Sequence, residues 1–335
     1  MKIGNIDLGN TPVCLAPMAG TSSVTYRGIC VEQGAAYGPT ELVSARSLAY
    51  GSLERSFRYM QISPSTEKVT AIQLFGYEPS DFEEAVKVIC NDDRLKDVDI
   101  IDINMGCPVA KVVKTGAGSA LMNEPEVAFR IVESTVRAAQ AYGKPVTVKT
   151  RIGFSEFGPA SVEFARGLAA SGAQMVCVHG RTAKQMYGGE ADWDAIKKMR
   201  DAVVSEGVKF FANGDVKDED SACRILDVTE ADGIMVGRAA MGDPWIFARI
   251  RAALDGKEIP QAPSVREKCD MLMRELQGTV ACIGEVTGVK EMRSVMPHYL
   301  KGLKGASAVK VELCRATTVA QVEVILKGFC DRWIS

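Results

Sequence analysis

The chain has 335 residues, of which 47% are hydrophobic and 24% charged, and its formal net charge is −2. This is the composition of an ordinary globular protein, and the length allows one large α/β domain plus a smaller one. The near-neutral balance gives no indication of nucleic-acid binding, no apolar run is long enough to cross a membrane, and the first ten residues, MKIGNIDLGN, lack the apolar segment of a signal peptide.

The ten cysteines form no C-x-x-C pair and lie mostly within apolar runs. We therefore expect reduced, buried thiols in a cytoplasmic protein. The only histidines are His179 and His298, which argues against a histidine-based metal centre, and we expect no metal.

Eight short apolar runs predict strands, and amphipathic helical segments separate most of them. The strands are expected at 13–17, 36–43, 69–74, 99–103, 145–149, 174–179, 208–212 and 232–236, with helices that include 79–90, 124–142, 159–171 and 217–227. Strands followed by helices imply parallel pairing with right-handed crossovers. Eight such units fit a (β/α)8 TIM barrel, which typically takes ~250 residues. A doubly wound open sheet is the structural alternative.

A helix opened by Asp243-Pro244 follows the last strand, residues 255–264 resemble a linker, and the chain from about residue 264 onward has a helical pattern. We predict an α/β fold in which a barrel, residues 1–250, precedes a small all-helical domain, residues 251–335. Residues 246–335 carry 14 Lys/Arg against 10 Asp/Glu, whereas the first 245 residues carry 26 against 32. Such a basic tail fits solvated helix faces as well as an RNA-binding surface.

Polar or glycine-rich residues lie at the carboxyl end of every predicted strand. In a barrel these ends converge on one rim, where active sites are built, so this pattern predicts an active site there. In chain order the residues are Pro17-Met18-Ala19-Gly20, Glu41, Gln73, Asn104-Met105-Gly106-Cys107, Lys149 with Arg151, His179-Gly180-Arg181, Asn213-Gly214-Asp215 and Gly237-Arg238.

The residue types at this rim indicate a charged or polar ligand. Barrels often bind phosphate at the loops after strands seven and eight, here Asn213-Gly214-Asp215 and Gly237-Arg238, although each alone is an ordinary turn. Lys149 is either a Schiff-base lysine or a fixed cation beside an anionic ring. Gln73 offers a donor and an acceptor to a flavin or pyrimidine edge, and His179 is a candidate donor.

Cys107 differs from the other cysteines because it follows a strand and lies in a loop, between Gly106 and Pro108. The proline restricts the backbone there. The thiol is a candidate nucleophile or general acid, since a pKa near ~8.5 leaves it protonated at neutral pH.

Several motifs together resemble the flavin-dependent tRNA-dihydrouridine synthases, and the bacterial B-type subgroup most. They are LAPMAGTSSVTYR, AIQLFG, DINMGCPVAKVVKTGAGSALM, VKTRIGF, VHGRTAKQMYGGEADW, NGDV and GIMVGRAAMGDPWIF, in this order over residues 1–250. The helical tail resembles the family's RNA-binding domain, but departs from its pattern near Ser294, where a basic residue is expected, and near His298, where an aromatic residue is expected.

The resemblance implies that residues 1–250 bind FMN and residues 251–335 bind RNA. It implies cofactor contacts from Pro17, Met18, Ala19, Gln73, Lys149, His179, Asn213, Gly214, Asp215, Gly237 and Arg238, and uracil contacts from Asn104 and Arg151. NADPH would reduce FMN, hydride would pass to C6 of a uridine, and Cys107 would protonate C5. The expected partner is tRNA or ribosomal RNA, with no DNA, no membrane and no obligate protein partner.

Three other functions remain open from the residues alone. The first is an FMN barrel acting on a small molecule, such as a dihydroorotate-type dehydrogenase. The second is a lyase that uses Lys149 as a Schiff base. The third is an RNA-binding or regulatory protein without turnover.

Overall fold

The computed structural model describes residues 1–334, so Ser335, the last residue of the predicted second domain, lies outside the described residues. Nine parallel strands form one sheet in the order β3-β11-β10-β9-β8-β7-β6-β4, with β5 also pairing with β6. They are β3 (Val13–Leu15), β4 (Gly38–Pro39), β5 (Val43–Ser44), β6 (Thr70–Phe75), β7 (Ile100–Met105), β8 (Val146–Arg151), β9 (Met175–His179), β10 (Lys209–Asn213) and β11 (Gly233–Val236).

The sheet closes on itself. The Leu15 N–H donates to the Tyr37 carbonyl at 2.9 Å, and the Ala36 N–H donates to the Val13 carbonyl at 2.9 Å, which joins β3 to the start of the second strand. The predicted TIM barrel is therefore confirmed, and the open sheet is wrong.

The second strand is interrupted where the sequence predicts a continuous run over 36–43. Pro39 pairs with Ala71 and Val43 pairs with Leu74, so one extra residue bulges out between β4 and β5. Within this bulge the Thr40 hydroxyl accepts the Gln73 N–H at 3.1 Å, in place of a backbone carbonyl. The bulge carries Glu41 at the rim of the barrel.

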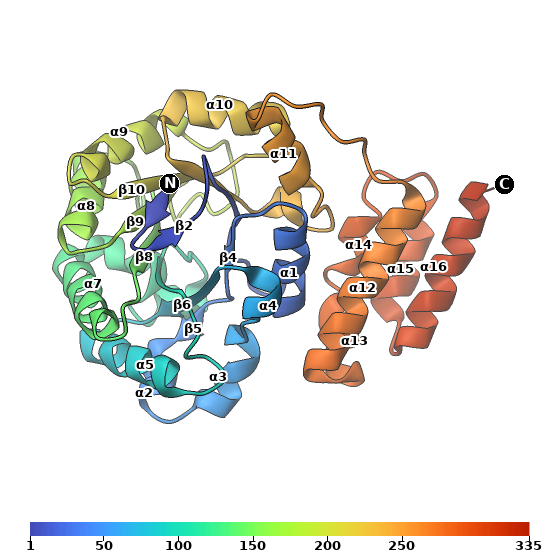
Figure 1. The fold of residues 1–335 in the computed structure, drawn as a ribbon, viewed down its shortest axis with the longest axis horizontal. Helices are drawn as coiled ribbons and strands as arrows, with labels where there is room; N and C mark the ends of the chain where they lie inside the picture. The colour runs from blue at the N-terminus through green and yellow to red at the C-terminus, as the bar shows by residue number, and fades with distance from the viewer. Residues whose placement is uncertain (335) are drawn as a thin grey trace.

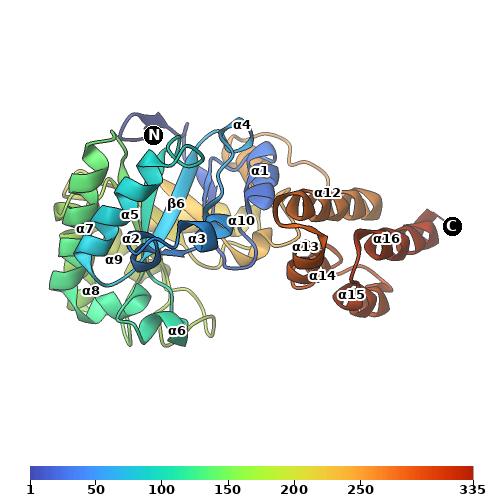
Figure 2. The same cartoon turned by 90° about the horizontal axis from the view of Figure 1, so that it is seen from below.

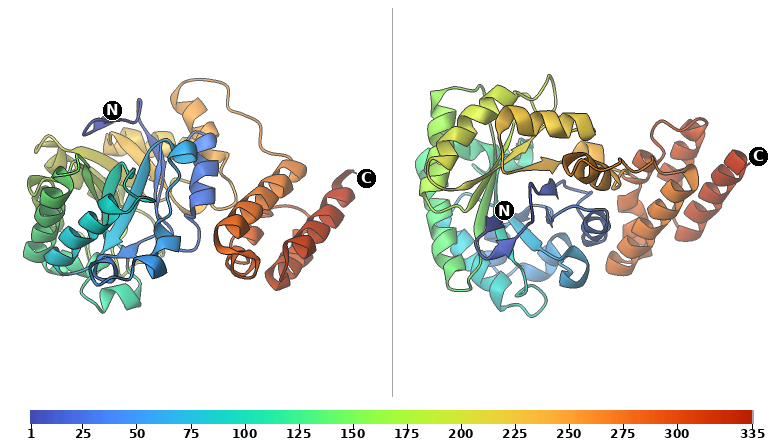
Figure 3. Two further views of the ribbon diagram at one scale, coloured as in Figure 1. Left: turned by 60° about the horizontal axis from the view of Figure 1, so that its bottom comes forward. Right: turned by 45° about the horizontal axis from the view of Figure 1, so that its top comes forward.

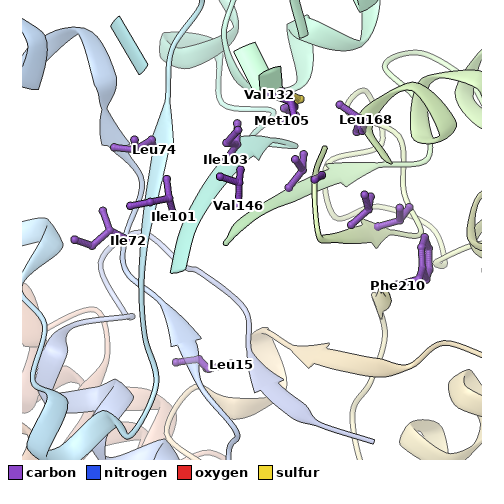
Figure 4. Close-up of a cluster of buried hydrophobic side chains, with 14 of the residues drawn as sticks. Leu15, Ile72, Leu74, Ile101, Ile103, Met105, Val132, Val146, Leu168 and Phe210 are labelled. Carbon is purple, nitrogen blue, oxygen red and sulfur yellow. The ribbon is translucent and has the colours of Figure 1, made fainter. Parts of the chain in front are cut away.

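Helices surround the barrel (Figure 1). The long ones are α1 (Val24–Glu32), α5 (Pro79–Asn91), α7 (Pro125–Gln140), α8 (Pro159–Ala170), α9 (Trp193–Val204), α10 (Glu219–Thr229) and α11 (Ile246–Leu254). Shorter ones in the connections are α2 (Ala45–Ala49), α3 (Leu53–Met60), α4 (Pro64–Glu67), α6 (Ala110–Val113), η1 (Gly118–Asn123) and η2 (Arg238–Ala240). The outward faces of the strands are apolar and bury Ile72, Leu74, Ile101 and Ile103 against these helices (Figure 4).

The opposite face of each strand lines the barrel interior, because side chains alternate along a strand. At one end this interior is apolar and includes Tyr37, Ile100 and Phe211. A hairpin of β1 (Lys2–Ile3) and β2 (Ile6–Asp7) covers that end with Ile3 and Leu8. In Figure 2 the N-terminus and α6, which follows β7, lie at opposite ends of the barrel. The carboxyl ends of the strands are thus left for the site.

The C-terminal segment forms its own packed group of helices beside the barrel (Figures 1 and 2). These are α12 (Val265–Ile283), α13 (Glu285–Met292), α14 (Met296–Tyr299), α15 (Ala306–Arg315) and α16 (Val319–Ile334). They bury a separate apolar cluster that includes Leu272, Leu276 and Leu313. An extended linker joins α11 to α12 (Figure 3), as the sequence predicts for 255–264. α11 packs on the barrel core and ends at Leu254.

The helical segment contacts the barrel through α12, α14 and α13, where Glu291 lies 3.3 Å from Arg58 on α3. Arg274 on α12 pairs with Glu32 on α1, and the backbone around His298 lies so close to Gly242 that a Cβ there would collide with the His298 carbonyl carbon. Only glycine fits at that position. Over residues 1–334, no helix combines the length and the apolar character that a membrane span needs.

Candidate active site

Predicted site residues from five neighbouring strands meet at the carboxyl ends of the barrel. Their side chains all face the barrel interior, because each residue lies two positions along its strand from a residue whose side chain lines the interior. The strand register sets Asn104 beside Lys149, Arg151 beside His179, and His179 beside Asn213. The residues brought together are Gln73 on β6, Asn104 on β7, Lys149 and Arg151 on β8, His179 on β9 and Asn213 on β10.

A chain of side-chain amides runs beneath Cys107. The Asn104 side-chain oxygen accepts the N–H groups of Gly106 at 3.2 Å and Cys107 at 2.9 Å. Its Nδ2 donates to Gln73 Oε1 at 2.8 Å, and Gln73 Nε2 donates to Asp102 Oδ2 at 2.6 Å. Asp102 is fully buried and was given no role by the sequence analysis, although a carboxylate within the apolar run 99–103 was a visible signal.

The loop that holds Cys107 folds back onto η1. The Ser119 N–H donates to the Cys107 carbonyl at 3.1 Å, and Gly118 has φ +62°, with room for no Cβ because one would lie 2.8 Å from the same carbonyl oxygen. The thiol is half-buried. Burial raises its pKa, and the Val109 N–H and the nearby Arg151 and Lys149 oppose the shift only in part. Cys107 is therefore a protonated thiol at neutral pH.

Lys149 and Asn213 form a second polar contact across the rim. Lys149 Nζ donates to Asn213 Oδ1 at 2.9 Å, and Asn213 Nδ2 donates to the Met235 carbonyl at 2.8 Å. Burial lowers the pKa of Lys149, with Arg151 adding to the effect and Asp102 opposing it. The arrangement fixes the ammonium group in place.

His179 lies among four cationic side chains. Its Nδ1 accepts the Arg181 N–H at 3.1 Å, which leaves the proton of the neutral ring on Nε2. Burial lowers the pKa of His179 well below its usual value, and Lys149, Arg151, Arg181 and Arg238 lower it further. The ring is thus a neutral hydrogen-bond donor at Nε2.

Two buried arginines fasten the loop of residues 182–190 to the site. Arg151, predicted to contact a substrate, donates from Nε to the Gly106 carbonyl at 2.8 Å and from Nη1 to the Thr182 and Met186 carbonyls at 3.1 and 3.0 Å. It therefore joins the Cys107 loop to this second loop. Arg181, predicted to lie at the rim but with no specific contact, donates to the Gly188 and Gly189 carbonyls and pairs with Asp215 through both Nη atoms.

The loops after β10 and β11 divide into an inward and an outward part. Asp215 has φ +56°. Its carboxylate accepts the Ala191 N–H and pairs with Arg181, so it faces neighbouring residues of the chain and not the open rim. Arg238 is 49% exposed, lies 3.3 Å from Asp215 and stacks 4.8 Å from the centre of the Tyr187 ring. A Cβ added to Gly237 would contact only the side chains of Ala16 and Met18, at ordinary van der Waals distance.

The segment after β3 borders the same rim. The Met18 N–H donates to Ser22 Oγ at 2.8 Å, and the Gly20 N–H donates to Glu41 Oε2 at 2.9 Å. Pro17 and Met18 are half-buried, whereas Ala19 is exposed. Burial raises the pKa of Glu41. The bulge between β4 and β5 thus positions this segment.

A closed (β/α)8 barrel with fixed cations, a neutral histidine and a protonated thiol at the carboxyl ends of its strands has the architecture of a TIM-barrel enzyme. The chain belongs to the dihydrouridine synthase family, because the family model described as Dihydrouridine synthase (Dus) matches residues 14–331. Among residues 1–334, no group of three His, Cys, Asp or Glu side chains is placed to hold a metal ion.

Curated relatives match nearly the whole chain. A probable tRNA-dihydrouridine synthase of Mycobacterium tuberculosis is 34% identical, over 97% of this chain and 84% of the relative. One of Rhodobacter capsulatus is 36% identical, over 96% and 95% of the two chains. The tRNA-dihydrouridine synthase B of Pasteurella multocida is 30% identical, over 98% and 95%.

Solved structures share the barrel at low sequence identity. A 2-naphthoyl-CoA reductase superposes with a TM-score of 0.57 at 10% identity, over 77% of this chain and 52% of the reductase. A histamine dehydrogenase from Rhizobium sp. 4-9 superposes with a TM-score of 0.52 at 14% identity, over 83% of this chain and 50% of the dehydrogenase. This chain spans about half the length of each, and the similarity concerns the fold.

Proposed function

We propose that this protein is a tRNA-dihydrouridine synthase that reduces the C5–C6 double bond of specific uridines in tRNA, with FMN as cofactor and NADPH as reductant. The observation that carries the proposal is the family match over residues 14–331, which spans both the rim of the barrel and the helical segment. The names of the relatives supply the substrate.

The side chains at the rim suit FMN. Lys149 is a fixed cation for an anionic ring, and His179 is a neutral donor for a ring carbonyl. Arg238 is half-exposed, so it is accessible to a phosphate. Bound FMN, reduced by NADPH, would supply the hydride that adds to C6 of uracil. The residues proposed to hold it are Pro17, Met18, Ala19, Gln73, Lys149, His179, Asn213, Gly214, Asp215, Gly237 and Arg238.

Reduction of the C5–C6 bond also requires a proton at C5, and we assign its source to a side chain of the protein. Addition of hydride at C6 leaves negative charge on C5 and O4, and the Cys107 Sγ–H donates its proton to C5. Burial favours this role, since it raises the pKa of the thiol and keeps the proton on sulfur until it is needed. Asn104 and Arg151 would contact the uracil, which must first leave the RNA stack.

The helical segment is the proposed RNA-binding part. Exposed cations there include Lys301 and Lys304, on either side of Gly302 between α14 and α15. Contacts of such side chains with phosphates release counterions, so tRNA affinity should fall with salt. The plot of log affinity against log salt has a negative slope, and Lys301→Ala/Lys304→Ala should make it less steep by up to ~2. An unchanged slope would exclude this surface from RNA contact.

The test of the reaction uses purified protein, FMN, NADPH and unmodified tRNA, with dihydrouridine measured by nucleoside mass spectrometry. Cys107→Ala should keep FMN, measured by flavin absorbance, and lose about 10²–10⁴-fold in rate, the usual contribution of a general acid. Cys223→Ala, at a half-buried cysteine of α10 outside the rim, is the matched control. A flavin-loaded protein that forms no dihydrouridine would refute the proposed reaction.

A further inference from the structure

Asp102 anchors the row of hydrogen bonds that ends at Cys107. It lies on β7 with its side chain in the barrel interior and is fully buried. Thr147 Oγ1 donates to its Oδ1 at 2.5 Å, and Gln73 Nε2 donates to its Oδ2 at 2.6 Å. Both contacts use the carboxylate as an acceptor, which is the only role an ionised carboxylate has.

Because the carboxylate can only accept hydrogen bonds, it fixes the orientation of the neighbouring side-chain amides. Gln73 must turn its NH₂ group toward Asp102, so its oxygen faces Asn104 and accepts Nδ2 at 2.8 Å. Asn104 must then turn its oxygen toward the backbone N–H groups of Gly106 and Cys107. An amide has nearly the same shape when rotated by 180°, so shape alone does not select this orientation.

We propose that Asp102 is a positioning residue for the proposed reduction, whose carboxylate sets the orientation of the Gln73 and Asn104 amides and through them holds the backbone of Cys107. The inference rests on the proposed function for the role of Cys107. Asp102 itself lies beneath the site and acts on the reacting atoms only through Gln73, Asn104 and the Cys107 backbone.

The charge on Asp102 is available for this role at neutral pH. Burial raises the pKa of Asp102 to about 6, while the hydrogen bonds from Thr147 and Gln73 and the nearby Lys149 oppose the shift. The group therefore remains ionised above pH 7. The Asp102 carboxylate in turn places a negative charge near the buried ammonium group of Lys149.

Asp102→Asn tests the inference because it keeps the shape and changes one acceptor into a donor. If Thr147 keeps donating to the oxygen of the introduced amide, the NH₂ group of that amide meets the NH₂ group of Gln73, and both amides beyond it must rotate. The NH₂ of Asn104 would then face the N–H groups of Gly106 and Cys107. Hydrogen–deuterium exchange with residue-level fragmentation should show these two backbone amides exchanging at least tenfold faster.

A compensating variant separates amide orientation from a general loss of packing. In Asp102→Asn/Gln73→Glu the carboxylate moves to position 73, where it accepts from both the introduced amide at position 102 and Asn104, so Asn104 keeps its orientation. Protection of the Cys107 amide should return, even though the Gln73 amide is gone. Thr135→Val, which removes a buried hydroxyl from α7 outside the row, should leave this amide unaffected.

The outcomes are distinguishable from those of the proposed function, because exchange is measured without RNA or reductant. Unchanged exchange in Asp102→Asn, or protection that fails to return in the double variant, overturns the inference whether or not dihydrouridine is formed. If the enzyme is active, Asp102→Asn should form dihydrouridine at least tenfold more slowly than Thr135→Val. Equal rates would also overturn it.

Discussion

The buried ion pair between Arg27 on α1 and Glu67 on α4 offers a quantitative test of what holds residues 17–19, the segment proposed to border FMN. Both side chains are 1% exposed, and Arg27 Nε lies 2.6 Å from Glu67 Oε1. Arg27 also donates to the Ser22 carbonyl at 2.6 Å and the Gln61 carbonyl at 2.5 Å. Ser22 is the residue whose hydroxyl accepts the Met18 N–H, so the pair supports the segment of Pro17, Met18 and Ala19.

Arg27→Met should lower the free energy of unfolding by about 3–5 kcal/mol. The substitution leaves the Glu67 carboxylate buried with one remaining donor, the Ser63 N–H at 2.7 Å, and breaking a buried pair on one side has this magnitude. In Arg27→Met/Glu67→Gln no isolated charge remains, so the loss should be smaller than the sum of the two single losses by at least about 1 kcal/mol.

Urea unfolding followed by circular dichroism measures these losses, and FMN affinity reports on the proposed role of residues 17–19. Arg274→Met is the matched control, because its pair with Glu32 is about half-exposed on both sides and should contribute ~0–1 kcal/mol. A loss below about 1 kcal/mol in Arg27→Met, or strict additivity in the double variant, would refute the reasoning.

Two further predictions concern a glycine and a buried carboxyl group. Gly118→Ala should destabilise the fold by more than Gly143→Ala. Both glycines have φ above +60°, so both substitutions share a backbone strain of about 1–2 kcal/mol, but only at Gly118 does the added Cβ lie within 3 Å of Cys107 and Val112. Equal losses of unfolding free energy in urea would contradict this. Burial raises the pKa of Glu275, which accepts the Tyr299 hydroxyl at 2.5 Å, to about 8. The folded state then binds the extra proton, so this group's stabilisation is complete below about pH 4.5 and is lost as pH rises toward 8, at about 1.4 kcal/mol per pH unit. Glu275→Gln should remove that slope from the free energy of unfolding measured between pH 5 and 7.5, and an unchanged slope would show that Glu275 does not cause it.

The barrel was predictable because its signals are local and repeat along the chain. Apolar runs flanked by helices locate the strands to within a few residues, as for 69–74 against β6 at Thr70–Phe75. The bulge before Val43 was not predictable, since it depends on Thr40 bonding to a strand that is distant in sequence. The helical tail was predictable as helix, whereas its packing against the barrel depends on contacts such as that of Gly242 with the backbone of His298.

The convergence of the site residues on one rim also followed from the sequence, because the carboxyl ends of barrel strands meet at one face. Their partners did not follow. Arg151 was expected to contact uracil, yet its Nε and Nη1 atoms are bonded to backbone carbonyls of two loops. Arg181 and Asp215 lie on different strand ends, and nothing local in either stretch indicates that they pair. The uracil contact of Arg151 stays a prediction.

The position of Cys107 therefore depends little on the cysteine side chain itself. Its N–H is held by Asn104, its carbonyl by the Ser119 N–H, and the preceding Gly106 carbonyl by Arg151. These three contacts come from β7, η1 and β8, so displacing the loop would break bonds to three separate elements. An acid that must deliver a proton to one carbon atom benefits from such support, because little reorganisation is then left for the reaction itself. On this reasoning, variants beneath the loop should impair proton delivery as effectively as changes beside the thiol.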